Sequence, residues 1–180
     1  MEKEDIIRNL KLLGEELVEL EIQQPVRLLM IGGGYMLTQI GSRTLTEDVD
    51  VLTRLDKYGE DYRRFRAAVR FITSDTHSDA RWFSDNIGDY MQLVGPIPEG
   101  TLWLKHGMLE VSVPEPQYIL VLKLLAGRDK DLDDIQVLLH RLRIKKRGQV
   151  EKLLQRYVFA DMLEDEREKI DDLLVRLLKA

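Results

Sequence analysis

The segment from Val26 to Ile31, with the sequence VRLLMI, most constrains how this chain can fold. Five of its six residues are apolar, it follows Pro25, and it stops at three consecutive glycines. A run this short favours a buried strand over a helix. Residues 47–53 then alternate charged residues with valine, which is the period-2 pattern of a second strand. The chain is therefore expected to turn at the glycines between a buried strand and an acidic one.

The rest of the chain favours an α+β fold. Apolar residues at helical spacing predict most of the helices, and two short apolar runs around His106-Gly107 predict a tight hairpin. The expected helices cover residues 4–21, 35–40, 58–74, 115–126, 129–143, 148–158 and 161–179, and the hairpin strands cover 101–105 and 109–113. Residues 75–100 are irregular in pattern and are expected to hold one short helix. These elements predict a small mixed β-sheet packed by helices, with a helical C-terminal part.

Composition excludes several classes of protein. The 180-residue chain has a net charge of -5, so any nucleic-acid partner must be met by a local basic patch. It has no cysteine, which excludes disulfides, thiolate zinc sites and a cysteine nucleophile. The acidic start, MEKEDIIRNL, is unlike a signal peptide, and no apolar run approaches the roughly 20 residues that span a bilayer. We therefore expect a cytoplasmic protein that has no membrane partner.

Two carboxylates in the acidic segment carry the most chemical information. Residues i and i+2 of a strand point to the same side, so Asp48 and Asp50 should project together while Val49 and Val51 face the opposite layer. Neighbouring carboxylates repel one another unless a cation lies between them, and oxygen ligands suit Mg2+ or Mn2+. A solvated strand edge is the alternative, but aspartate is a poor strand former. The segment therefore predicts a metal site.

The glycines by themselves are less specific. A strand that runs through glycines into a helix directs backbone N–H groups at one point, where a phosphate can bind. An ordinary tight turn explains Gly32, Gly33 and Gly34 equally well. The dinucleotide-binding pattern G-x-G-x-x-G is broken by Leu37, and no Gly-Lys-Ser/Thr follows to form a P-loop. The downstream aspartates favour the phosphate site.

The order and spacing of these motifs resemble the DNA polymerase beta-like nucleotidyltransferase superfamily, and within it the small bacterial enzymes related to the AbiEii toxins of toxin–antitoxin pairs. The resemblance covers roughly residues 25–142. It rests on Gly33-Gly34, on the segment RTLTEDVD from Arg43 to Asp50, and on KLLAGR at 123–128 followed by DLDDI at 131–135. It implies a nucleotidyltransferase-like core over residues 1–143, with residues 144–180 as a helical extension packed on the same domain.

The resemblance also implies roles for individual residues. Gly33 and Gly34 would contact nucleotide phosphates, and Asp48 and Asp50 would bind the metal. Active members have a third carboxylate on a neighbouring strand, for which Glu110 is the candidate. Arg43 and Lys123 would be weaker contributors to nucleotide binding, although Arg43 could be an ordinary exposed arginine and Lys123 could extend its stem over the core.

These interpretations predict a metal-dependent enzyme that transfers NMP from an NTP to a hydroxyl of RNA or protein. The resemblance suggests a toxin with a cognate antitoxin protein as partner. The alternative is a catalytically inactive binding or regulatory module of the same fold, and a Rossmann domain is a more distant one. Two basic clusters, at 63–70 and 140–147, could hold a nucleic-acid backbone, but the net negative charge favours solvated helix faces.

Overall fold

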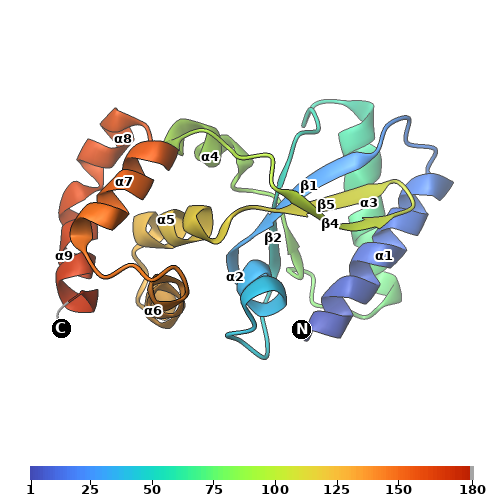
Figure 1. The fold of residues 1–180 in the computed structure, drawn as a ribbon. Helices are drawn as coiled ribbons and strands as arrows, with labels where there is room; N and C mark the ends of the chain where they lie inside the picture. The colour runs from blue at the N-terminus through green and yellow to red at the C-terminus, as the bar shows by residue number, and fades with distance from the viewer. Residues whose placement is uncertain (179–180) are drawn as a thin grey trace. The chain divides into compact units, whose positions relative to one another are not determined.

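Five strands form one mixed sheet in the order β3-β2-β1-β5-β4 (Figure 1). The computed structural model describes residues 1–178, except for the side chain of Asp89. The strands are β1 (Val26–Ile31), β2 (Val49–Thr53), β3 (Phe83–Ser84), β4 (Thr101–His106) and β5 (Leu109–Val113). The central strand β1 is antiparallel to β2 and parallel to β5. The expected α+β fold with a mixed sheet is confirmed.

Two helices bury one face of this sheet. They are α1 (Lys3–Glu19) and α3 (Glu60–Asp75). Alternate residues of β1, Val26, Leu28 and Met30, share a hydrophobic core with Val49 and Val51 of β2. From α1 the core receives Ile6, Leu10, Leu13 and Leu17, and from α3 it receives Phe65, Ala68, Val69 and Ile72. Because side chains alternate along a strand, Asp50 lies on the opposite face from this core.

A close backbone approach fixes α1 against the β4–β5 hairpin. The Met108 amide donates a hydrogen bond of 3.1 Å to the carbonyl of Gly14 in α1. A Cβ atom at Gly14 would lie 2.2 Å from the carbonyl oxygen of His106. Glycine at position 14 is therefore required by the packing of the helix on the hairpin turn.

The chain separates into two compact units. Residues 1–88 and 99–114 form the first unit, which contains the sheet, and residues 89–98 join the chain from Glu115 onward in the second. The helices of the second unit are α4 (Gly88–Val94, beginning at the boundary), α5 (Pro116–Ala126), α6 (Leu132–Arg141), α7 (Arg147–Tyr157), α8 (Ala160–Asp165) and α9 (Arg167–Leu177), with a 3-10 turn at Asp129–Asp131. The boundary expected after residue 143 stays a prediction.

The apolar helix α5 lies at the centre of the second unit. Its buried residues include Tyr118, Leu120 and Leu124, and α6, α7 and α9 pack around it. The helix ends at Ala126, as expected, and Gly127 follows it in a left-handed conformation, with φ of 61°. The single helix expected at 161–179 is instead divided into α8 and α9 at Glu166, and residues 179–180 lie outside the described part. No helix within residues 1–178 has both the length and the apolar composition needed to cross a bilayer.

Candidate functional site

The glycines after β1 form a tight turn into an irregular helix. Gly32 adopts φ of 64°, a left-handed conformation that favours glycine. The helix α2 (Gly32–Tyr35) continues directly as a π-helix (Met36–Ile40), which ends at Gly41. The Gly41 amide donates to the carbonyl of Met36, five residues earlier, at 2.9 Å. Such π-helical turns are rare and often occur at functional sites.

Two of the three glycines lie against side chains of the acidic segment. A Cβ atom at Gly32 would be 2.2 Å from Oδ2 of Asp50. A Cβ atom at Gly33 would be 2.4 Å from the Thr46 hydroxyl and 3.6 Å from Nη1 of Arg43. The glycines therefore let a carboxylate, a hydroxyl and a guanidinium approach the backbone directly. We call Gly32, Gly33, Arg43, Thr46 and Asp50 the glycine–aspartate site.

Gly34 has a different environment from the one expected. Its nearest neighbours are Met30 and Val49, both buried in the core, at 3.5 to 3.6 Å from a Cβ position. Gly34 therefore lies against the core, whereas Gly32 and Gly33 line the site. Sequence patterns did not predict Gly32 or Thr46 as site residues, because a run of three glycines shows neither the turn conformation nor which side chains each glycine meets.

The two aspartates lie at the start of β2. Asp50 is half-buried and pairs with Ile31 of β1 on one side and Ser84 of β3 on the other. Asp48 precedes the strand, is also half-buried, and its carbonyl accepts a hydrogen bond of 3.1 Å from the Thr46 hydroxyl. Val49 and Val51 are fully buried on the other face, as expected. The carboxylate of Asp50 is the one that the structure brings to the glycines.

Glu110 does not lie beside Asp50. The strand register pairs Glu110 with Arg27, whereas Asp50 pairs with Ile31, four residues further along β1. Four residues of a strand span about 13 Å. Glu110 instead accepts hydrogen bonds from Lys105 at 2.8 Å and Arg27 at 3.2 Å. The hydrogen bond from Lys105 contributes most to holding the pKa of Glu110 below its ordinary value. The structure therefore does not support Glu110 as a third ligand.

Asp85, the carboxylate that follows β3, is also held by structural partners and not by the site. Asp85 directly follows β3, and its side chain is fully buried. It accepts hydrogen bonds from Arg66 at 2.8 Å and Tyr62 at 3.0 Å, both on α3. These partners place Asp85 on the helix-covered face, away from Asp50. Within the described residues, no group of three histidine, cysteine, aspartate or glutamate side chains could hold a metal ion.

The donor set at the acidic segment still suits one kind of metal ion. Mg2+ keeps several waters and is commonly held by one or two carboxylates together with substrate phosphates. Asp48 and Asp50 supply two carboxylates, and the Thr46 hydroxyl adds an oxygen nearby. Oxygen ligands of this kind fit a magnesium or manganese ion.

Lys123 lies in the second unit and is buried in a cluster of charges. Its ammonium is 2.6 Å from Asp131 and 2.6 Å from Asp134, and its side chain is 5% exposed. Arg128 also donates to Asp131 at 2.6 Å. Burial by itself would raise the pKa of Asp131, but the hydrogen bonds from Arg128 and Lys123 lower it below its ordinary value. Asp131 and Asp134 therefore form ion pairs that engage Lys123, which was expected to contact a nucleotide.

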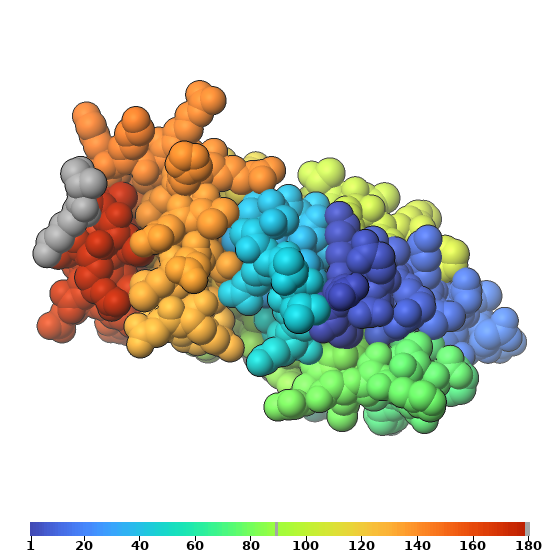
Figure 2. Space-filling view, turned by 90° about the horizontal axis from the view of Figure 1, so that it is seen from below, coloured from blue at the N-terminus to red at the C-terminus, as the bar shows by residue number. Residues whose placement is uncertain are grey.

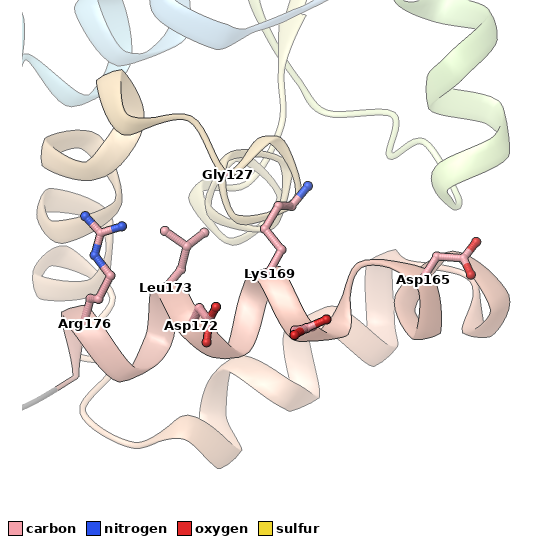
Figure 3. Close-up of a pocket in the computed structure, with 7 residues that line it drawn as sticks. Gly127, Asp165, Lys169, Asp172, Leu173 and Arg176 are labelled. Carbon is pink, nitrogen blue, oxygen red and sulfur yellow. The ribbon is translucent and has the colours of Figure 1, made fainter.

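A separate cavity of about 450 Å³ lies in the second unit, beside the end of α5. In Figure 3, Lys169, Leu173 and Arg176 extend from α9 along it. It is lined by Gly127, Asp165, Glu168, Lys169, Asp172, Leu173 and Arg176. None of these residues belongs to the glycine–aspartate site, so the cavity adds nothing to that chemistry.

In three comparisons with known proteins, no family model, no curated protein and no solved structure matches this chain. The resemblance to nucleotidyltransferases therefore stays a prediction, and the function must be argued from the residues of the site.

Proposed function

We propose that the chain is a metal-dependent nucleotidyltransferase, which transfers NMP from an NTP to a hydroxyl of RNA or protein. One observation carries the proposal: the carboxylate of Asp50 lies against Gly32 while the side chains of Arg43 and Thr46 lie against Gly33. An acidic group, a cationic group and half-buried glycine backbone thus meet at one end of two neighbouring strands. This combination suits a metal–triphosphate substrate.

The glycine backbone and Arg43 would bind the phosphates. Glycine has no Cβ, so a phosphate oxygen can approach the amides of Gly32 and Gly33 closely. The guanidinium of Arg43 is a forked donor whose geometry matches phosphate oxygens. These groups would hold the α-phosphate in position for attack, and alignment of this kind lowers the barrier by reducing the entropy lost at the transition state.

Asp48 and Asp50 would hold the metal ion. When bound, a divalent cation neutralises charge on the departing pyrophosphate and orients the phosphate oxygens. The carboxylate of Asp50, which lies against Gly32, would hold this positive charge close to the phosphates. Because metal and phosphate complete each other's coordination, we expect NTP binding to depend on the metal and on Asp50.

A second function is favoured because the described part of the chain places no third carboxylate next to Asp50 in the sheet. The neighbours of Asp50 in the sheet are Ile31 and Ser84, and Glu110 lies four residues away along the strands. A chain that binds nucleotide but lacks a group to accept the proton of the attacking hydroxyl would serve as a binding or regulatory module. A cognate antitoxin partner remains a prediction under either function.

The decisive experiment measures binding and transfer separately. Each NTP is titrated by calorimetry with Mg2+ or Mn2+, and labelled NTPs are incubated with total RNA and with protein. Asp50→Asn should weaken metal-dependent binding at least tenfold and abolish transfer. Glu110→Gln is the matched control on the same sheet face and should change binding by less than twofold.

The outcomes separate the two functions. Binding that is lost in Asp50→Asn, together with label transfer, supports the enzyme. Binding without transfer to RNA or protein favours the module. If no NTP binds in the presence of either metal, the nucleotide site itself is wrong.

A further inference from the structure

The junction of α6 and α7 carries a concentrated positive charge. Residues 135–150 contain five arginines and lysines and no acidic residue, within a chain of net charge -5. All five are exposed, and Arg141, Arg143, Lys145 and Lys146 precede Arg147, which has acidic partners. We call these four residues the α6–α7 basic surface. In Figure 2 the orange part of the chain, which includes the α6–α7 junction, shows several side chains that extend into the surroundings.

These cations differ from several other basic residues, which pair with carboxylates. In the cluster at 63–70, Arg63 and Arg64 pair with Glu60, and Arg66 pairs with Asp85. At the edge of the basic surface, Arg147 pairs with Asp171 and Glu151. By contrast, across residues 1–178 no ion pair joins a carboxylate to any of the four residues of the α6–α7 basic surface.

The backbone that presents these cations is held at both ends. At the end of α6, Arg143 donates to the His140 carbonyl at 3.0 Å and buried Ile144 donates to the Leu139 carbonyl at 2.9 Å. These two bonds form a Schellman motif. At the start of α7, the amides of Lys145 and Lys146 donate to Oε1 of Gln149 at 2.9 and 3.0 Å. The positive charges are therefore attached to an ordered loop.

We propose that the α6–α7 basic surface binds the phosphodiester backbone of a nucleic acid. Four cations without carboxylate partners, at the end of α6 and on the ordered loop after it, attract a chain of regularly spaced phosphates, and binding releases the counterions condensed on that chain. Arginine adds forked hydrogen bonds to phosphate oxygens. A membrane surface fits less well, because Ile144 is buried and Leu142 is half-buried, so the segment offers no exposed apolar side chain to insert.

The proposal predicts a specific salt dependence. For a single strand, the slope of log K against log salt is about -0.7 for each neutralised phosphate, so four contacts predict about -3. Backbone contacts carry no sequence information, so RNA and DNA of the same sequence should bind alike. The binding does not depend on the proposed nucleotidyltransferase activity.

The test uses the full chain without NTP or metal, with a fluorescein-labelled 20-nucleotide RNA and the matching DNA, in an anisotropy titration from 50 to 300 mM KCl. The surface variant is Arg141→Gln, Arg143→Gln, Lys145→Gln and Lys146→Gln together. The control variant has the same change of charge at four exposed residues elsewhere, namely Lys3, Lys11, Arg70 and Lys130, each replaced by Gln. The surface variant should bind the RNA and DNA at least tenfold more weakly and lose most of the salt slope. The affinity of the control variant should change by less than threefold.

A single substitution separates charge from folding. Arg143 adopts φ of 55°, so Arg143→Gly relieves a strained conformation and should leave the melting temperature unchanged or raised. It should still weaken binding and reduce the salt slope by about 0.7. His77→Gly is the matched control, since His77 has φ of 53° at the end of α3 and lies outside the basic surface.

Three results would overturn the proposal. An equal loss of nucleic-acid affinity in the surface variant and the control variant would mean that net charge alone attracts the nucleic acid. Tighter binding to a polyglutamate peptide, or to phosphatidylserine vesicles, would assign the surface to an acidic protein or a membrane. Asp50→Asn should bind the nucleic acid like the unmodified chain, so failure of the nucleotide site and failure of this surface are distinguishable.

Discussion

The buried charge cluster around Lys123 offers a sharp test of the structure. We expect Lys123→Met to destabilise the protein because it removes the ammonium that lies 2.6 Å from both Asp131 and Asp134. The two carboxylates are 2% and 3% exposed, so water cannot replace the lost partner. Breaking a buried ion pair costs about 3–5 kcal/mol. Arg128 still neutralises Asp131, which favours the lower end of that range.

The expected loss of about 3 kcal/mol corresponds to a fall in melting temperature of about 6–12 °C for a chain of this size. Thermal and urea unfolding followed by circular dichroism measure it. Lys130→Met is the matched control, because Lys130 is exposed in the same segment, and it should change stability by less than about 0.5 kcal/mol. The double variant Lys123→Met/Asp134→Asn should cost less than the sum of its two single changes.

The cluster also has a definite pH dependence. The pKa of Asp131 is lower in the folded protein than its ordinary value of 3.8, so its ionised form contributes stability that is present above that pH. This contribution is lost as the pH falls below about 4. Asp131→Asn should therefore flatten the acid side of the stability curve. If Lys123→Met keeps the original melting temperature but loses NTP binding, Lys123 is a nucleotide ligand and the structural interpretation is wrong.

Three further predictions follow from the packing. Gly14→Ala should destabilise the protein by about 1–3 kcal/mol in urea unfolding, because its Cβ would lie 2.2 Å from the His106 carbonyl, whereas Gly148→Ala has open space and should be neutral or stabilising. Burial raises the pKa of Tyr118 to about 12, so in an ultraviolet titration this tyrosine should ionise at a higher pH than exposed tyrosines. The stability of the protein should fall as the pH rises from 10 to 12, because only the unfolded chain ionises readily in that range. Tyr118→Phe should remove the late phase of the titration. Asp85→Asn should lower the melting temperature by several degrees, because Asp85 is a buried partner of Arg66. The variant should bind NTP with unchanged affinity. A loss of affinity would show that Asp85 takes part in the site.

Much of the fold could be predicted because it depends on local patterns. The apolar run at 26–31 became β1 with the expected bounds, and the helix expected at 115–126 ends at Gly127 as α5. Helix α1 follows its apolar spacing as well. Strand β3 was missed, since two residues paired with β2 have no periodicity of their own. The break at Glu166 was also missed, because Leu163 and Ile170 are seven residues apart, which is the spacing of a continuous helix.

The site was predictable only in part. The chain itself placed Asp50 on the face opposite Val49 and Val51, because alternation along a strand is a local property. The sequence could not show that Gly32 and Gly33, not Gly34, would meet the acidic segment, since this depends on the turn conformation at Gly32. Nor could it show the role of Thr46.

By itself, the sequence determined the kinds of element, their order, and the presence of glycines and carboxylates at the end of a buried strand. The tertiary structure decided which charged groups meet. Glu110 alternates correctly on its strand, but the register of β5 against β1 places it beside Arg27 and far from Asp50. In the sequence Lys123 is a single cation within an apolar helix, and only the packing of α6 against α5 brings Asp134 to its ammonium. Register and helix packing are set by contacts between distant segments, so partners of this kind are not encoded in any local pattern.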